Sequence, residues 1–97
     1  MNLGAAIKEL RKERGLSQVE LAQMAKTTQA SLSQIEAGRR PKTETLKNIS
    51  ICLNVPEALL YIMGLEKKDI PKKNIDRYET LFPILKNMIK SLVIEDA

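Results

Sequence analysis

Side chains that can contact the edges of nucleic-acid bases gather in one short stretch, residues 28–38 (Thr-Gln-Ala-Ser-Leu-Ser-Gln-Ile-Glu-Ala-Gly). A glutamine amide can pair with N6 and N7 of adenine, and a methyl group can pack on that of thymine. At helical spacing, Leu32 and Ile35 would face the protein while small polar residues face outward. The predicted base contacts are Gln29, Ala30, Ser33 and Gln34. A solvated helix start is the alternative for Gln29, and simple helix propensity is the alternative for Ala30.

Basic residues follow this stretch directly and could neutralise the phosphates that flank a groove. Contacts of this kind contribute affinity without selecting a base sequence. Arg39, Arg40 and Lys42 are the predicted phosphate contacts of this cluster. Thr28 is expected to cap the helix and can contact a phosphate at the same time. For the basic cluster, a solvated loop is the alternative.

Helices must position these groups, because apolar residues recur at helical spacing and strand signals are missing. Ser17 and Glu20 form a capping box that starts the second of five expected helices. The other expected boundaries are Gly15 (end of the first helix), Thr28 and Gly38 (start and end of the third), Thr43 (cap of the fourth), and Pro56 and Gly64 (start and end of the fifth). The sequence predicts an all-α domain over residues 1–65 with a helix-turn-helix, whose second helix is shaped to enter the major groove of DNA.

The rest of the chain is expected to consist of a charged linker, residues 66–76, and a C-terminal helical segment, residues 77–97. Apolar side chains at 3-4 spacing form a stripe on this segment, and we predict that the stripe joins two copies of the chain. The predicted dimerisation residues are Tyr78, Leu81, Phe82, Leu85, Met88, Ile89 and Leu92. Because Pro83 interrupts the segment, the helix either begins afresh there or is kinked. The alternative to dimerisation is that the segment folds back onto the first and fifth helices of its own chain.

Composition argues against several other classes of function. The 97 residues carry a formal net charge of +4, as expected of a nucleic-acid binder. With no histidine, no paired-carboxylate site and no phosphate-binding glycine loop, we expect no enzymatic activity, no metal and no cofactor. Cys52 is the single cysteine and is expected to be a buried thiol in a cytoplasmic protein. The sequence predicts no membrane span and no secretory signal.

Four short motifs resemble the Cro/XRE family of helix-turn-helix regulators, which includes the lambdoid phage repressors. They are Leu-Ser-Gln-Val-Glu-Leu-Ala (16–22), Ser-Gln-Ile-Glu-Ala-Gly (33–38), Thr-Leu (45–46) and Leu-Asn-Val (53–55). The likeness covers residues 4–65 and implies a five-helix, lambda-repressor-like domain that binds double-stranded DNA. The chain departs from the family pattern in two places. Lys26 stands where the family usually has glycine in the turn, and residues 36–46 are one residue shorter.

The resemblance also implies roles for individual residues. Gln29 would be the main base-contacting residue, and Gln18 would hold a phosphate while bracing the first residue of the recognition helix. Arg11 and Glu36 would form an ion pair that orients the motif. A partly buried pair of this kind costs about 3 kcal/mol or more to break from one side.

The predicted function is that of a sequence-specific transcriptional regulator, a repressor that binds a palindromic operator as a homodimer with its third helix in the major groove. Two alternatives remain open. The chain could be an antitoxin or another protein-interaction module that also binds DNA and has a partner protein. It could also be the controller protein of a restriction–modification system.

Overall fold

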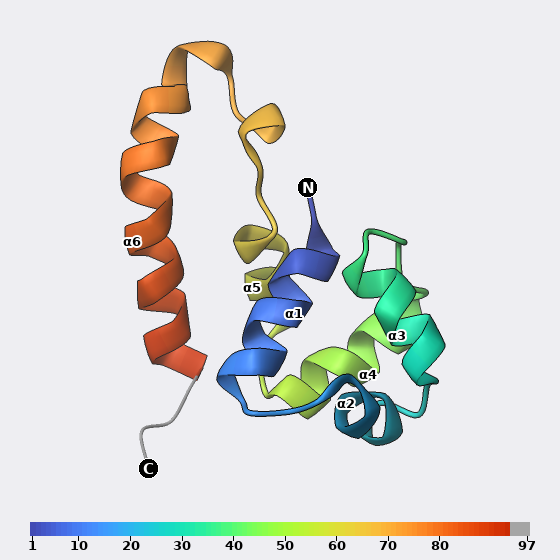
Figure 1. Ribbon diagram of the computed structural model, residues 1–97. Helices are drawn as coiled ribbons and strands as arrows, with labels where there is room; N and C mark the ends of the chain where they lie inside the picture. Colours follow the sequence, from blue (N-terminus) through green and yellow to red (C-terminus); the bar gives the residue numbers. More distant parts are fainter. Residues whose placement is uncertain (94–97) are drawn as a thin grey trace.

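The computed structural model describes residues 1–93 and contains only helices over that range, which confirms the predicted all-α fold. The α-helices are α1 (Leu3–Glu13), α2 (Gln18–Met24), α3 (Gln29–Glu36), α4 (Thr43–Leu53), α5 (Glu57–Met63) and α6 (Ile75–Val93). Two short 3-10 helices, η1 (Lys67–Asp69) and η2 (Lys72–Asn74), precede α6. In Figure 1, α1–α5 cluster together, and α6 lies on the side of α1 that is opposite α3.

Short-range hydrogen bonds set where the motif helices begin. The Ser17 hydroxyl accepts from the Glu20 N–H, and the Glu20 carboxylate accepts from the Ser17 N–H, so the predicted capping box is confirmed. Thr28 caps α3 as predicted, because its hydroxyl accepts from the Ser31 N–H. The predicted cap of α4 is wrong. Lys42 occupies the N-cap position without a side-chain hydrogen bond, and Thr43 is already the first helical residue.

A left-handed residue closes the turn between α2 and α3. Lys26 has φ 58°, which is the conformation that glycine usually supplies. The Thr27 N–H donates to Ala22 O and the Lys26 N–H donates to Gln23 O, which is the pattern of a Schellman motif. A left-handed conformation costs a non-glycine residue about 1–2 kcal/mol. The turn therefore forms with lysine at the left-handed position.

The core joins α1–α5 through aliphatic side chains. The side chains that are buried most completely are Ile7, Leu10, Leu21, Leu32, Ile35, Ile49, Leu53 and Leu60. Helix α1 crosses α3 in close contact at Gly4, where an added Cβ would lie 2.0 Å from Ile35 O. Only glycine fits this crossing, so Gly4 fixes how near α3 lies to α1.

The C-terminal helix docks on α1 of its own chain. This agrees in part with the alternative prediction, in which the segment folds back onto the first and fifth helices. Ile89 and Val93 are 3% and 7% exposed and belong to the core cluster. Lys86 Nζ lies 2.9 Å from Glu9 Oε1, and Lys90 Nζ lies 3.5 Å from Glu9 Oε2. Ile89 was a predicted dimerisation residue, and this assignment is wrong because its own chain already covers it.

Arg14, at the end of α1, holds two helix ends together. Its Nε donates to Leu53 O at 3.1 Å, at the end of α4, and its Nη2 donates to Val93 O, at the end of α6. Lysine and arginine donors of this kind satisfy the carbonyl groups that a helix end leaves unpaired. The last turn of α6 is therefore fastened to the α1–α5 body.

The predicted linker is more ordered than its charge suggested, because η1 and η2 lie within it. The N-terminal amine lies 2.9 Å from Glu66 Oε1 and 2.8 Å from Asp69 Oδ2. Helix α6 begins at Ile75, two residues earlier than expected, and continues through Pro83 as one helix, so no fresh start occurs there. Residues 94–97 of the predicted segment lie outside the described residues.

Cys52 is half-buried, which is less than predicted, and its neighbour Ile51 is 66% exposed. Burial raises the pKa of the Cys52 thiol, as expected for an unreactive cysteine. Within residues 1–93, no helix is both long and apolar enough to cross a bilayer.

Candidate nucleic-acid interface

Helix α3 presents a polar face to solvent and an apolar face to the core. Leu32 and Ile35 are 0% and 1% exposed, and they anchor the helix against α1 and α2. The four predicted base-contacting residues are all exposed, namely Gln29, Ala30, Ser33 and Gln34. They share the outer face because residues three and four apart meet on the same side of a helix. Helix α3 is therefore anchored through its apolar face, and its polar face is accessible to a ligand.

A chain of hydrogen bonds links the first residue of α3 to helices α1 and α2. Gln29 Nε2 donates to Gln18 Oε1 at 3.5 Å, and Gln18 Nε2 donates to Glu36 Oε1 at 3.1 Å. Glu36 in turn accepts two bonds from Arg11, at 2.7 Å from Nε and 3.0 Å from Nη2. The structure thus brings together Arg11, Gln18, Gln29 and Glu36, which restrains the side chain at the start of α3.

The Arg11–Glu36 pair at the base of this chain is almost free of solvent. The two side chains are 9% and 3% exposed, and Arg11 Nη1 also donates to Leu16 O at 2.8 Å. The hydrogen bond to Glu36 raises the pKa of Arg11. Burial alone would raise the pKa of Glu36, but hydrogen bonds from Arg11 and Gln18 outweigh it and hold that pKa below its usual value. Both groups therefore stay charged.

Acid should remove the contribution of Glu36 to stability. Because its folded-state pKa is lowered, this contribution is complete above the ordinary glutamate pKa of about 4.3 and is lost as the pH falls through the lower folded value. The free energy of unfolding in urea, measured from pH 7 downwards, should fall more steeply for the parent than for Glu36→Gln. Glu44→Gln, at an exposed position, serves as the control and should keep the parent's slope. Equal slopes for the parent and Glu36→Gln would contradict the assignment.

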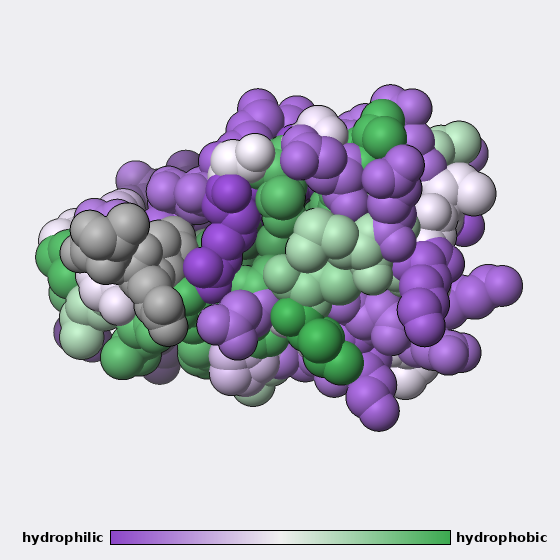
Figure 2. All heavy atoms as spheres, turned by 90° about the horizontal axis from the view of Figure 1, so that it is seen from below, coloured by the Kyte–Doolittle hydropathy of each residue, from purple (hydrophilic) through white to green (hydrophobic). Residues whose placement is uncertain are grey.

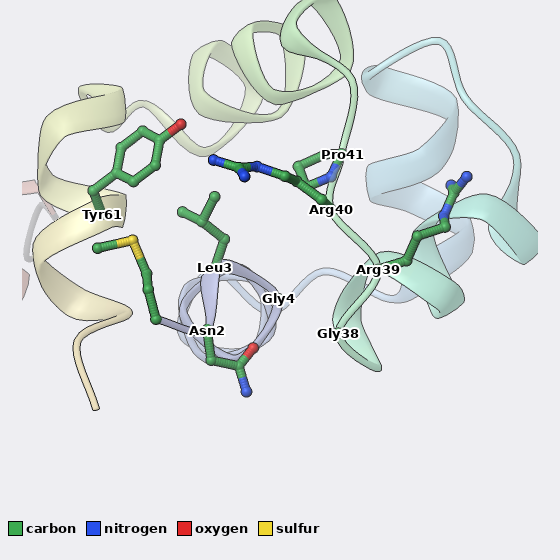
Figure 3. Close-up of a pocket in the computed structure, with 9 residues that line it drawn as sticks. Asn2, Leu3, Gly4, Gly38, Arg39, Arg40, Pro41 and Tyr61 are labelled. Carbon is green, nitrogen blue, oxygen red and sulfur yellow. The ribbon is translucent and has the colours of Figure 1, made fainter. Parts of the chain in front are cut away.

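The two arginines after α3 point in different directions. Arg39 Nη2 donates to Ser31 Oγ at 2.6 Å, so its guanidinium lies beside the start of α3. Figure 3 shows Arg40 extending instead over Leu3 towards Tyr61, across a cavity of about 190 Å³. Lys42 is exposed at the start of α4. Of the predicted phosphate contacts, the structure places Gln18, Thr28 and Arg39 at the start of α2 and α3, but not Arg40.

Two features of the interface were not predicted from the sequence. Ser31 orients Arg39, and this contact depends on the direction in which the chain leaves Gly38, where φ is 122°. Gly4 sets the distance from α1 to α3. The role of Gly4 could have been predicted from its position inside an expected helix. A glycine there costs about 1 kcal/mol relative to alanine, which indicates that close packing requires it.

A helix with an exposed polar face, held over a second helix by a tight left-handed turn, defines the helix-turn-helix class of DNA-binding proteins. The family model described as helix-turn-helix matches residues 7–60, and the chain belongs to this family, as a regulator of the Cro/XRE type. The chain is similar to the "ImmF control region 10 kDa protein" of Bacillus phage phi105, with 46% identity over 54 residues. That match spans 55% of this chain and 60% of the phage protein. No solved structure matches the chain.

Proposed function

We propose that this DNA-binding regulator is a repressor that binds a palindromic operator as a homodimer, with α3 in the major groove. The observation that carries the proposal is the exposed polar face of α3, whose first residue is braced by Gln18. A restrained glutamine at the start of a recognition helix is suited to the two-bond contact with adenine. The wording "control region" in the name of the phage relative agrees with a regulatory role.

Phosphate contacts on both sides of the groove would fix the register of α3. The Gln18 amide uses one proton on Glu36 and keeps a second that can donate to a phosphate oxygen. The Thr28 hydroxyl accepts from the Ser31 N–H and keeps its own proton free for the same purpose. Arg39 adds charge beside them and Lys42 follows further along the loop, whereas Arg40 points away towards Tyr61. These contacts would supply the affinity that does not depend on sequence.

The proposed dimer depends on α6, whose outer face is apolar and is not covered by any other part of residues 1–93. Of the predicted dimerisation residues, Leu81, Leu85, Met88 and Leu92 are exposed, whereas Tyr78 and Phe82 are half-buried and stack on each other at 4.9 Å. A two-fold dimer would present two α3 helices to half-sites about 34 Å apart. In vitro selection of bound duplexes should therefore recover inverted repeats. Recovery of single, unpaired sites would argue against the dimer.

Base and phosphate contacts can be separated by two substitutions. On the selected duplex, Gln29→Ala should weaken binding by about 1–3 kcal/mol and relax the preference at one base position. Arg39→Ala should weaken binding to all duplexes alike and should reduce the slope of log affinity against log salt by about 1. Titration of specific and random duplexes at several salt concentrations measures both effects.

Matched substitutions elsewhere on the surface control for loss of the side chains alone. Gln23→Ala on α2 and Lys73→Ala on η2 change exposed residues of the same or similar type outside the proposed contacts. Both should bind as the parent does. The assignment of α3 as the recognition helix is wrong if Gln29→Ala and Arg39→Ala also bind every duplex as the parent does.

A further inference from the structure

Helix α6 carries an apolar face that residues 1–93 leave open. Its members, which we call the α6 stripe, are Leu81, Ile84, Leu85, Met88 and Leu92, with exposed fractions of 58%, 55%, 41%, 61% and 80%. At 3.6 residues per turn they fall within an arc of roughly 100°. Ile89 and Val93, which dock on α1, lie about 100° away around the helix. The stripe is therefore a second face, separate from the docked one.

The stripe is large enough to be an interaction surface. Its members expose apolar area equal to about three fully exposed large side chains, roughly 500 Å², which matches the largest patch on a typical monomer. Two copies packed on it would bury about 1,000 Å², near the lower limit for a specific interface. A groove lined by Leu65, Ile70 and Tyr78 adjoins the stripe and extends it. Figure 2 shows apolar side chains at the end of the molecule where α6 lies.

We propose that the α6 stripe packs against the stripe of a second copy with the two helices antiparallel. Leu85 lies at the two-fold axis, because it is midway along α6 between Tyr78 of the adjoining groove and Leu92 at the end of the stripe. Because its five members are uncharged, a second copy meets no repulsion along the stripe. Within Ile75–Val93, Arg77 is the one charged residue on the same arc, and it lies near the N-terminal end of α6. In a parallel pair the two Arg77 side chains would face each other. In an antiparallel pair each would face the last turn of the other helix, where the helix dipole is negative.

The position of α3 leads to the same orientation, in a step that rests on the proposed function. Figure 1 places α6 and α3 on opposite sides of α1. The buried face of α3 packs on α1 and α2, so its exposed face is turned away from α1 and from α6 behind it. The docked face of α6 points towards α1 and α3. The stripe is turned by roughly 100° from it, so the stripe points nearly perpendicular to the line that joins α6 to α3.

The symmetry axis decides which orientation can bind one duplex. The two-fold axis of an antiparallel pair is perpendicular to the helices, and here it runs along the line from α6 to α3. Both α3 helices then face the same side, as one duplex requires. The axis of a parallel pair runs along the helices and would turn the second α3 to the opposite side.

Single cysteines on the stripe distinguish the two orientations. In a Cys52→Ser background, Leu85→Cys places two thiols at the proposed axis, where mild oxidation should join the chains. Leu92→Cys lies seven residues from the axis, so its two copies would be about 21 Å apart in an antiparallel pair. A disulfide needs Cα atoms within about 7 Å, so this variant should stay unlinked. Asn87→Cys, exposed outside the arc, controls for random collision.

Sedimentation of the parent chain and binding of the oxidised Leu85→Cys dimer to an inverted repeat complete the test. We expect a dimer in sedimentation and retained binding by the linked chain. Linking of Leu92→Cys as readily as Leu85→Cys would show a parallel pair and overturn the inference alone. A dimer in which Leu85→Cys links no faster than Asn87→Cys would exclude the stripe as the interface. A monomer at concentrations that saturate DNA would overturn the dimer of the proposed function as well.

Discussion

Replacing Arg11 with methionine should lower the free energy of unfolding by about 3–5 kcal/mol, because it leaves the Glu36 carboxylate buried without its charged partner. Methionine keeps much of the side-chain volume, so the loss reports the broken pair and not a cavity. The Leu16 carbonyl also loses its donor. Urea unfolding at neutral pH measures the effect.

A double substitution separates the loss of the ion pair from the cost of leaving one buried charge without its partner. Arg11→Met combined with Glu36→Leu removes both charges and should be less destabilised than Arg11→Met alone, because no uncompensated charge remains. Its affinity for the specific duplex should still fall, since Gln18 loses its acceptor on Glu36 and no longer holds Gln29 in place. A loss below about 1 kcal/mol for Arg11→Met would place this pair with exposed ion pairs, contrary to its burial.

Replacing Gly4 with alanine should destabilise the protein by about 1–3 kcal/mol or more through overpacking. The new Cβ would lie 2.0 Å from Ile35 O and 3.0 Å from Glu36 Cα, and both are backbone atoms that cannot turn aside. Helices α1 and α3 would have to move apart, which would also disturb the Arg11–Glu36 pair beside the crossing. Thermal or urea unfolding together with DNA titration measures both consequences.

The sign of the Gly4 effect makes this a sharp test. In an uncrowded helix, alanine is more favourable than glycine by about 1 kcal/mol, so helix propensity alone predicts a more stable protein. Ala5→Gly at the exposed neighbouring position isolates propensity and should cost no more than about 1 kcal/mol. A stabilised Gly4→Ala variant would mean that α1 and α3 are not held at this spacing.

The parts of the fold that depend on local patterns were predictable from the sequence. Ser17 with Glu20 and Thr28 mark helix starts because the cap and its acceptor lie within three residues of each other. The cap of α4 was misassigned because Thr43 has the right side chain but stands one position too late, after Lys42. The exact residue at which a helix begins depends on the backbone conformation at the end of the preceding loop, which the local sequence pattern does not determine.

The two faces of α6 could not be separated from the sequence. Spacing of three and four residues merges Ile89, which faces α1, with Leu85 and Met88, which face outward, into one apparent stripe. The choice between them was made by Glu9 and Arg14, which lie more than 70 residues away along the chain. Periodicity within one helix contains no information about partners at that distance.

The contacts of Arg14 have a consequence for how the molecule opens. The Arg14 guanidinium donates to the final carbonyl groups of both α4 and α6. If either helix end is released, Arg14 is held less firmly, and its hydrogen bond to the other helix end weakens. Fraying at the end of α6 and loosening at the end of α4 should therefore be coupled. Amide protons in the last turns of both helices should exchange with solvent in a single cooperative unit.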